Sequence, residues 1–349
     1  MSVASLDKAR TTAEFTRLRL DGSEADLLDA LLDETLLLVG DDTAEEHLVV
    51  LARDAARRVP ARLRSTLDTI RLWERPSGLL VSGCRVDDAD LGPTPASWRT
   101  AGRRVREELL LLILTAALGE PYAWSTQQAG RLVHDILPTQ GDEHVQLGSS
   151  SATELLWHTE DAFHELRCDY LALLCLRNDE QVGTTVAVPD LHELSGRTRQ
   201  VLAEPRFHIL PDDSHLSARN PGHRDSPGLA DRFDDVERRL ADPTAVSLLF
   251  GPPDRPYLRI DPAYMAPVPG DDLAAAALAE AYELVERSLR DVALAPGEVL
   301  VLDNYRGVHG RRPFRARYDG RDRWLKRVSV TRDLRRQRMA AGSSSSWTV

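Results

Sequence analysis

The segment Leu156-Trp157-His158-Thr159-Glu160-Asp161 places an imidazole and a carboxylate two positions apart. If this segment is an extended strand, His158 and Glu160 point to the same side, because side chains alternate along a strand. A second imidazole, His309, follows the apolar stretch Val299–Leu302. Two imidazoles and one carboxylate bind one face of an iron ion and leave three coordination positions open for oxygen chemistry. The sequence therefore predicts that His158, Glu160 and His309 hold one metal ion.

Alternatives to this interpretation stay open at this point. A His-x-Glu pair also arises by chance, and His164 is a competing ligand, although its position suits the far side of a turn better than the face of His158. The same three ligands could hold zinc with a water in the fourth position, as in a zinc-dependent hydrolase. They could also belong to a non-catalytic binding module.

Composition and charge narrow the class of protein. With 42% hydrophobic and 28% charged residues, the 349-residue chain resembles a globular protein. Its formal charge of −11 argues against a nucleic-acid surface and suits a small cationic or zwitterionic ligand. Residues 1–20 do not resemble a signal peptide, and the longest apolar run, 109–117, is too short to span a bilayer. The cysteines lack the spacing of a disulfide scaffold. We expect a cytoplasmic protein without a nucleic-acid or membrane partner.

The sequence pattern changes along the chain from helical to β-like. Helices are expected from a cap at Ser23 through Leu32, over 43–58, and over 101–118. After His158, short apolar segments between turn signals predict strands. These segments are 170–176, 184–188, 206–210, 246–250, 257–260, 299–302 and 326–331. One helix, within 271–292, interrupts the series. The pattern predicts an α+β protein built around a sandwich or barrel.

Two segments are expected to be irregular. Residues 211–226 combine Pro, Gly, Asp, Asn and His with little periodicity, which fits a long surface loop, and such loops are often lids. The Ser-rich segment 339–349 is predicted to be a disordered tail. We expect one domain over 1–338. It would have a helical part over 1–120, a β core over about 121–335 and a lid over about 211–229.

Two arginines follow His309 at informative positions. Arg323 lies fourteen positions after His309, and Arg327 has the same parity, so one strand face would present both guanidinium groups. Arginine matches a carboxylate through a bidentate pair. A surface salt bridge is the alternative for any single arginine, but a zinc site requires neither residue. The pair therefore favours a carboxylate-binding site beside the metal.

Taken together, His158-Thr159-Glu160, His309 and Arg323 resemble the clavaminate synthase-like branch of the 2-oxoglutarate oxygenases, over roughly residues 91–335. Within that branch the chain is most similar to enzymes that hydroxylate free amino acids, of the L-arginine β-hydroxylase type of viomycin biosynthesis. The resemblance implies a distorted double-stranded β-helix, or jelly roll, with helices packed outside. It also implies Fe(II) as the metal, 2-oxoglutarate as cosubstrate and O2 as oxidant.

The resemblance assigns roles to further residues. Arg323 would pair with the far carboxylate of 2-oxoglutarate, with the Thr185 hydroxyl beside it and Thr184 as the neighbouring alternative. Gln127 would hold the amino acid backbone, and Arg327 would pair with the substrate α-carboxylate. Glu160 would also accept a hydrogen bond from the α-amino group. Lid residues Asp212 and Ser214 would close over the substrate, and Asp261 would face its guanidinium group, since a buried acid and a cation offset each other's desolvation.

The sequence departs from the arginine enzymes at Ala263, where they carry a second acid. The implied reaction is hydroxylation at Cβ or Cγ of a free L-amino acid, most nearly L-arginine, in non-ribosomal peptide biosynthesis. The missing carboxylate weakens the case for arginine and opens citrulline, enduracididine or lysine as substrates, and desaturation as the outcome. The oligomeric state is left open.

Overall fold

A seven-stranded sheet lies at the centre of the protein. The computed structural model describes residues 14–220, 229–343 and 345–349. The spatial order of the sheet is β1 (Phe15–Arg19), β2 (Gly78–Ser82), β13 (Val299–Asp303), β6 (Tyr170–Arg177), β15 (Trp324–Thr331) and β3 (Glu120–Tyr122), with β4 (Val133–Ile136) also paired to β15. Strands β1 and β2 run parallel, whereas the other pairs are antiparallel.

A four-stranded sheet packs face to face on the large one. Its order is β12 (Arg290–Val292), β7 (Thr184–Ala187), β14 (Val308–Arg311) and β5 (Leu155–His158). Leu173 and Cys175 of β6 share an apolar cluster with Val186 of β7 and Val292 of β12. Alternate residues of β6, such as Leu174, point to the opposite side and join another cluster. The two sheets therefore form a sandwich.

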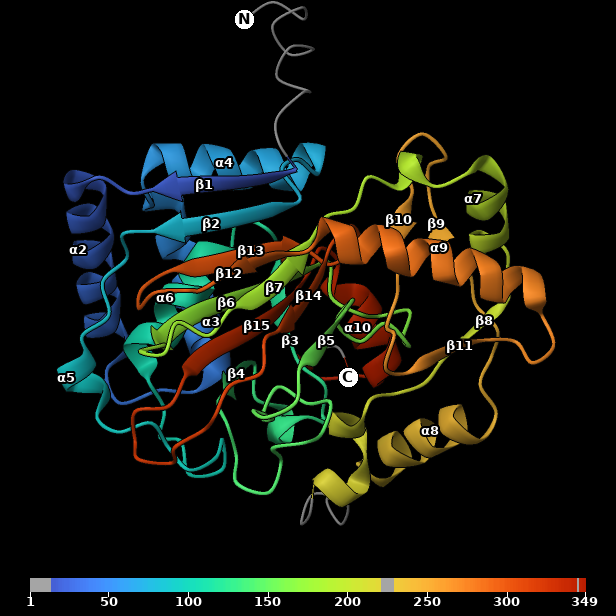
Figure 1. Ribbon diagram of the computed structural model, residues 1–349. Coiled ribbons are helices and arrows are strands. Elements are labelled where there is room, and N and C mark those ends of the chain that lie inside the picture. The colour runs from blue at the N-terminus through green and yellow to red at the C-terminus, as the bar shows by residue number, and fades with distance from the viewer. Residues whose placement is uncertain (1–13, 221–228, 344) are drawn as a thin grey trace, which may run out of the picture.

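Helices from the first third of the chain cover the outer face of the large sheet (Figure 1). They are α2 (Gly22–Val39), α3 (Glu45–Ala55), α4 (Ala61–Trp73) and α6 (Val105–Thr115), with the short α5 (Asp88–Leu91) and the 3-10 turn η2 (Ala56–Arg58). Helix α6 packs on β6 and β15, and α3 packs on α6. The stretch Leu109–Leu114 is buried throughout, because α6 lies between the sheet and the other helices.

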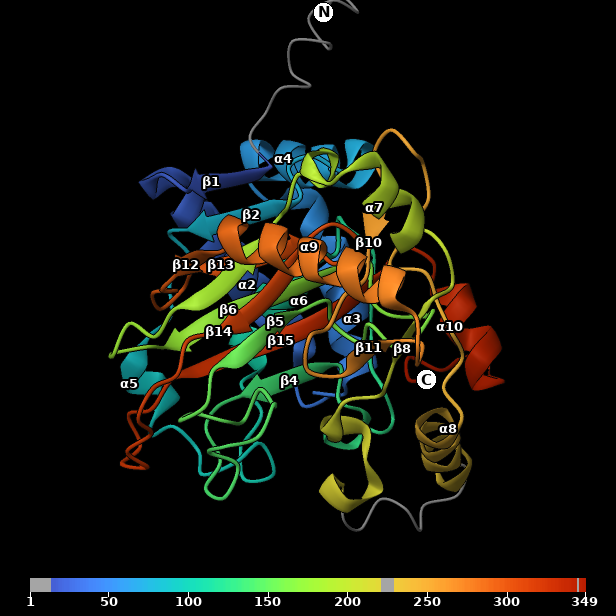
Figure 2. The same ribbon diagram turned by 45° about the vertical axis from the view of Figure 1, so that its right-hand side comes forward.

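Helix α9 (Asp272–Ser288) covers the outer face of the small sheet and lies across the strands in Figure 2. Its Ala- and Leu-rich face shares a cluster with Trp157 and Val308 of that sheet and with α7 (Gly196–Leu202). The remaining strands form two short pairs, β8 (Phe207–Ile209) with β11 (Met265–Pro267) and β9 (Leu249–Phe250) with β10 (Tyr257–Leu258). Further helices are α8 (Ala230–Ala241), α10 (Leu334–Ala341), η3 (Gln128–Gly130), η4 (Leu191–Glu193), η5 (Asp213–His215) and η6 (Ser217–Arg219).

The structure confirms an α+β protein and every expected strand segment, with small shifts at the ends. The first helix begins two residues earlier than expected, because Asp21 rather than Ser23 is its N-cap and forms a capping box with Glu24. The expected helix over 271–292 ends at Ser288, and its last residues form β12. Among the described residues, no helix combines the length and apolar character needed to cross a bilayer.

The prediction of a disordered tail over 339–349 is wrong for the residues that the structure describes. Helix α10 continues to Ala341, and the chain then returns to the end of β3. Val349 is buried, its amide donates to Ala123 O at 2.9 Å, and its carbonyl accepts from Ser125 N at 2.9 Å. These backbone bonds hold a polar segment that composition alone marks as irregular. In the expected lid, residues 211–220 form η5 and η6, whereas 221–228 lie outside the described residues.

Candidate active site

The three predicted metal ligands come together in the small sheet. His158, at the end of β5, is paired across the strands with His309 of β14. Glu160 follows two residues later, and its Oε2 lies 3.6 Å from His158 Nε2 and 3.3 Å from His309 Nε2. The ligand atoms of all three lie within 4.8 Å of one another. The side chain of Asn304 fixes the backbone of Glu160 by accepting from its amide at 2.8 Å and donating to its carbonyl at 3.0 Å.

The environment of the triad suits a cation. The Nδ1 of His158 lies 2.8 Å from Leu156 O, which leaves Nε2 facing Glu160. Metal-bound imidazoles are usually oriented in this way, by a hydrogen bond from the ring nitrogen that does not bind the metal. Burial opposes the charged form of His158, but the hydrogen bond to Glu160 and the negative charges of Asp261 and Glu160 together outweigh burial and raise the pKa of His158 to about 9. Burial and the charge of His158 lower the pKa of His309 to about 4. Two imidazoles and a carboxylate thus lie within reach of one another and form a donor set that fits an iron ion.

His164, the competing ligand, lies outside the triad. Its Nδ1 accepts from Leu166 N at 3.0 Å, and its Nε2 lies 3.1 Å from Arg239 Nη2. Both ring nitrogens are therefore engaged elsewhere.

Arg327 projects from β15 toward the metal ligands. It forms an ion pair with Glu160 Oε1, its Nη2 donates to Gln127 Oε1 at 3.3 Å, and the same nitrogen lies 2.8 Å from His134 Nδ1. Burial and the charge of Arg327 keep the pKa of His134 well below its usual value, so His134 is neutral and accepts this bond. His134 is cross-strand from Arg327 on β4. Its role was not predicted, because a long-range strand pairing leaves no local signal.

Arg323 lies on the same side of the chain as Arg327, just before β15. Its Nη2 donates to Thr184 Oγ1 at 2.8 Å. The prediction of Thr185 at this position is therefore wrong, and the neighbouring Thr184 takes the place. Adjacent residues of a strand point to opposite faces, so only one of the two hydroxyls can reach the guanidinium group. Thr185 lies beside Gly310 of β14 instead.

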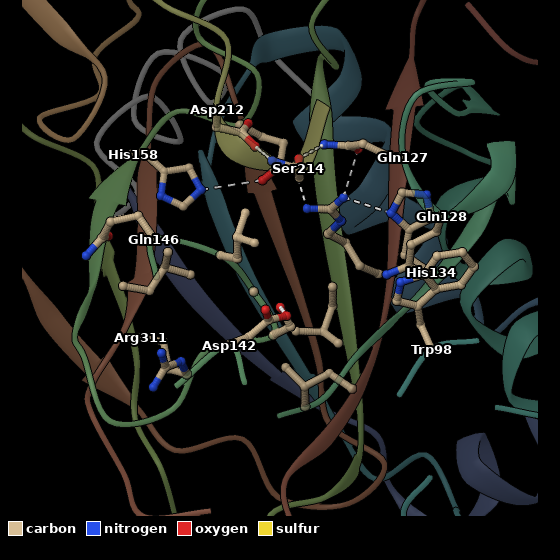
Figure 3. A pocket seen from close by; sticks show the side chains of 18 of the residues that line it. Trp98, Gln127, Gln128, His134, Asp142, Gln146, His158, Asp212, Ser214 and Arg311 are labelled. Carbon is tan, nitrogen blue, oxygen red and sulfur yellow. Dashed lines mark hydrogen bonds and ion pairs between the residues drawn. The ribbon is translucent and has the colours of Figure 1, made fainter. Parts of the chain in front are cut away.

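A single pocket joins these groups to the predicted substrate residues (Figure 3). Gln127 Nε2 donates to Ser214 Oγ at 2.6 Å, so the expected lid already contacts the residue expected to hold the substrate backbone. Asp261 is 8% exposed, and its Oδ1 accepts from the amides of Ala263 and Tyr264. Burial raises the pKa of Asp261 to about 6. The predicted residues that line this pocket are Gln127, His158, Glu160, Asp212, Ser214, Asp261, His309, Arg323 and Arg327.

A buried network, absent from the predictions, connects the expected lid segment to the residue next to the predicted metal ligand Glu160. His215, next to Ser214, lies 3.0 Å from Asp161 Oδ1 through Nε2 and 2.8 Å from Thr126 Oγ1 through Nδ1. Asp161 follows the ligand Glu160, has a positive φ of 50°, and accepts from Trp124 Nε1 at 2.6 Å. His215 directly follows the predicted lid residues Asp212 and Ser214, and this position in the sequence could have identified it as a candidate site residue.

Comparisons with known proteins agree with this geometry. Residues 110–329 match the family described as "Taurine catabolism dioxygenase TauD, TfdA family". The chain is 41% identical to an enduracididine beta-hydroxylase of Streptomyces hygroscopicus, over 93% of this chain and 96% of that protein. It is also 41% identical to an L-ornithine/L-arginine 3-hydroxylase of Catenulispora acidiphila, over 81% and 85% of the two chains.

A crystal structure of the non-heme iron oxygenase OrfP with Fe, succinate and (3S)-hydroxy-L-Arg superposes with a TM-score of 0.89. It is 40% identical and covers 96% of this chain and 99% of OrfP. The chain therefore belongs to the TauD, TfdA family, and it is an iron- and 2-oxoglutarate-dependent dioxygenase. This confirms the resemblance drawn from the sequence and sets the zinc hydrolase and the non-catalytic module aside.

Proposed function

We propose that the protein hydroxylates the side chain of a free L-amino acid, L-arginine or a close relative, at Cβ or Cγ. The observation that carries the proposal is that one pocket contains the triad of His158, Glu160 and His309, the arginines 323 and 327, and the buried carboxylate of Asp261. Each group matches one part of the reactants. The curated relatives act on enduracididine and on ornithine or arginine, which supports a basic amino acid.

Iron and 2-oxoglutarate would be held by different groups of the same pocket. His158 Nε2, Glu160 and His309 Nε2 would hold the iron, and Arg323 with the Thr184 hydroxyl would hold the far carboxylate of 2-oxoglutarate. Iron, 2-oxoglutarate and O2 would supply the oxidising chemistry. The protein would position the reactants and exclude water. The Nε of Arg323 is buried without a partner among the described residues, as expected of a group whose partner is a ligand.

The amino acid would be held at both ends. Arg327 would pair with its α-carboxylate, Gln127 would bind its backbone, and Glu160 would accept from its α-amino group. Asp261 would face the cationic end of the side chain, because a buried acid and a buried cation offset each other's desolvation. Asp212 and Ser214 would close over the substrate. Holding both ends places one methylene toward the metal. A misplacement of the substrate by about 1 Å is enough to lower the rate of such a reaction about a hundredfold.

Ala263 favours a second candidate among the substrates. Ala263 lines the pocket beside Asp261 and offers no carboxylate. A single acid can serve a neutral or cyclic side chain as well as a guanidinium group, so citrulline and enduracididine remain candidates, with lysine as a further one. Desaturation is the alternative outcome for the same arrangement of groups.

We further propose that the two packed sheets form a distorted double-stranded β-helix and that residues 1–338 act as one oxygenase domain, as expected from the sequence. The shared apolar cluster between the sheets and the helices that cover both outer faces support this architecture. All three cysteines are buried free thiols, which is in keeping with a cytoplasmic location. Natural-product biosynthesis is the setting that the relatives suggest.

A substrate panel tests the proposal. The protein is loaded with Fe(II) without oxygen, mixed with 2-oxoglutarate and one amino acid, and exposed to air, and the products are analysed by mass spectrometry. We expect succinate together with a product that has gained one oxygen atom, with the highest kcat/KM for arginine or enduracididine. A loss of two hydrogen atoms would identify a desaturase. Iron-independent turnover, or none with any amino acid, would contradict the proposal.

A further inference from the structure

Arg311 is a buried arginine of the pocket to which the proposed function gives no role (Figure 3). It lies on β14, two residues after His309, so both side chains point to the same face of the small sheet. Arg311 is paired directly across the strands with Thr184 of β7. Side chains of such a pair lie next to each other. Because the Thr184 hydroxyl binds Arg323, the three residues Arg311, Thr184 and Arg323 form one row along the pocket wall.

The partners of Arg311 among the described residues include no anion: the ring of Phe314 lies 5.1 Å from its guanidinium carbon, and its hydrogen bonds go to neutral groups. Its Nη1 donates to the carbonyls of Ser151 and Arg312 at 3.0 and 2.9 Å. Its Nη2 donates to Ser150 Oγ at 2.7 Å and to Thr153 O at 3.0 Å. All four acceptors are neutral. These bonds hold the guanidinium group in place without neutralising it.

No carboxylate of the described residues forms an ion pair with Arg311 or Arg323. The nearby acid Glu154 pairs with Arg312 Nη1 at 2.6 Å instead. Arg311 is 2% exposed and Arg323 is 7% exposed, and the Nε of each is buried without a partner among the described residues. Burial lowers the pKa of Arg311 to about 9, and the positive charge of Arg323 contributes to this shift. Two uncompensated cations side by side are costly unless an anion binds between them.

We propose that Arg311 is a positioning residue for 2-oxoglutarate and acts with Arg323 on its far carboxylate. The inference rests on the proposed function and refines its cosubstrate site. Arg323 and Thr184 supply direct hydrogen bonds, and Arg311 supplies a second fixed charge and one further N–H donor. The arrangement selects 2-oxo acids that carry a second carboxylate over those that end in a methyl group.

Calorimetry on protein loaded with Zn(II), which does not turn over, tests this inference. The ligands are 2-oxoglutarate and 2-oxovalerate, which has the same carbon chain without the far carboxylate. In Arg311→Met we expect the affinity for 2-oxoglutarate to fall by about tenfold or more, because a charge-assisted contact is lost. The affinity for 2-oxovalerate should stay within about threefold, because that ligand never used the contact. Arg311→Lys, which keeps a charge, should retain part of the discrimination.

Arg312→Met is the matched control, because Arg312 is the adjacent arginine and pairs with Glu154 and Asp291 at the surface. Equal losses for both ligands in Arg311→Met would overturn the inference and leave Arg311 a role only in holding residues 150–153. Unchanged binding of 2-oxoglutarate would overturn it as well. A wild-type protein that does not prefer 2-oxoglutarate would instead contradict the proposed cosubstrate itself.

Discussion

At the scale of single residues, the site depends on which face of a strand each side chain occupies. The spacing of His158 and Glu160 was interpretable from the sequence, because a separation of two positions puts both on one side. The same rule could not choose between Thr184 and Thr185, because it fixes their relation to each other and not the face that points inward. The rule also applies to His309 and Arg311, so Arg311 could have been found. His134 could not, because its contact with Arg327 depends on a pairing of distant strands.

The two threonines provide a matched pair of substitutions. Thr184→Val removes the hydroxyl that binds Arg323, and we expect the KM for 2-oxoglutarate to rise about three- to tenfold, since the loss of one hydrogen bond to a charged group costs about 1 kcal/mol or more. Thr185→Val, the control, should change this KM by less than about twofold. Steady-state kinetics at saturating amino acid measures both. A larger effect at Thr185 would contradict the placement of Arg323.

Asp261 is the residue that we propose selects a cationic side chain. In Asp261→Asn the shape is kept and the charge is lost, so kcat/KM for arginine should fall about tenfold to a hundredfold, as expected when a buried charge loses its partner. The value for citrulline, which is neutral, should change by less than about threefold. Competition experiments with both amino acids give this ratio directly. Equal losses for the two would refute the assigned role.

At the scale of elements, β15 serves the site on one face and the fold on the other. Arg327 points into the pocket, whereas Lys326 is fully buried under α6 and bonds Glu108 Oε1 at 3.0 Å and Asp135 Oδ1 at 2.8 Å. Trp324 Nε1 also donates to Asp135. This ion cluster ties α6 and β4 to the strand that carries Arg327, the arginine proposed to bind the substrate.

Lys326→Met should destabilise the protein without altering the chemistry of the pocket. The substitution leaves two buried carboxylates without their shared cation, and we expect a loss of about 3–5 kcal/mol in the free energy of unfolding. Urea titration followed by circular dichroism measures it. The control is Arg238→Met on the exposed side of α8, which should cost less than about 1 kcal/mol. A similarly small loss at Lys326 would show that the cluster does not hold β15 in place.

The proposed lid is the second element whose attachment can be tested. His215→Phe keeps the ring packed against Trp124 and Phe163 but removes the bonds to Thr126 and Asp161. We expect the amino acid KM to rise about tenfold, because the lid residues lose their anchor, while the KM for 2-oxoglutarate stays within about twofold. The number of hydroxylated amino acid molecules formed per molecule of succinate should also fall. The exposed His192→Phe is the control, and parallel rises of both KM values would rule out a specific role for the lid.

At the scale of the whole molecule, the sequence predicted the strands and helices that a local residue pattern marks. It did not predict the features that depend on tertiary contacts. The strand segments were found because short apolar runs between turn residues mark them. The pairing of β1 with β2 and the helix α4 after Pro60 were not foreseen, since both depend on distant partners. The C-terminal segment was misjudged for the same reason, because its order comes from backbone bonds to Ala123 and Ser125. All of the predicted site residues except Thr185 line one pocket, because the sequence motifs fix their residue types and spacings.

We propose that His158, Glu160 and His309 hold the iron that directs oxygen onto an amino acid bound in the same pocket. The most direct measurement is turnover under ¹⁸O2 with Fe(II), 2-oxoglutarate and L-arginine or enduracididine, with both products analysed by mass spectrometry. One labelled oxygen atom should appear in the hydroxylated amino acid and one in succinate, and Glu160→Ala should form neither product. An amino acid product without label, or full activity in Glu160→Ala, would contradict this role of the three residues.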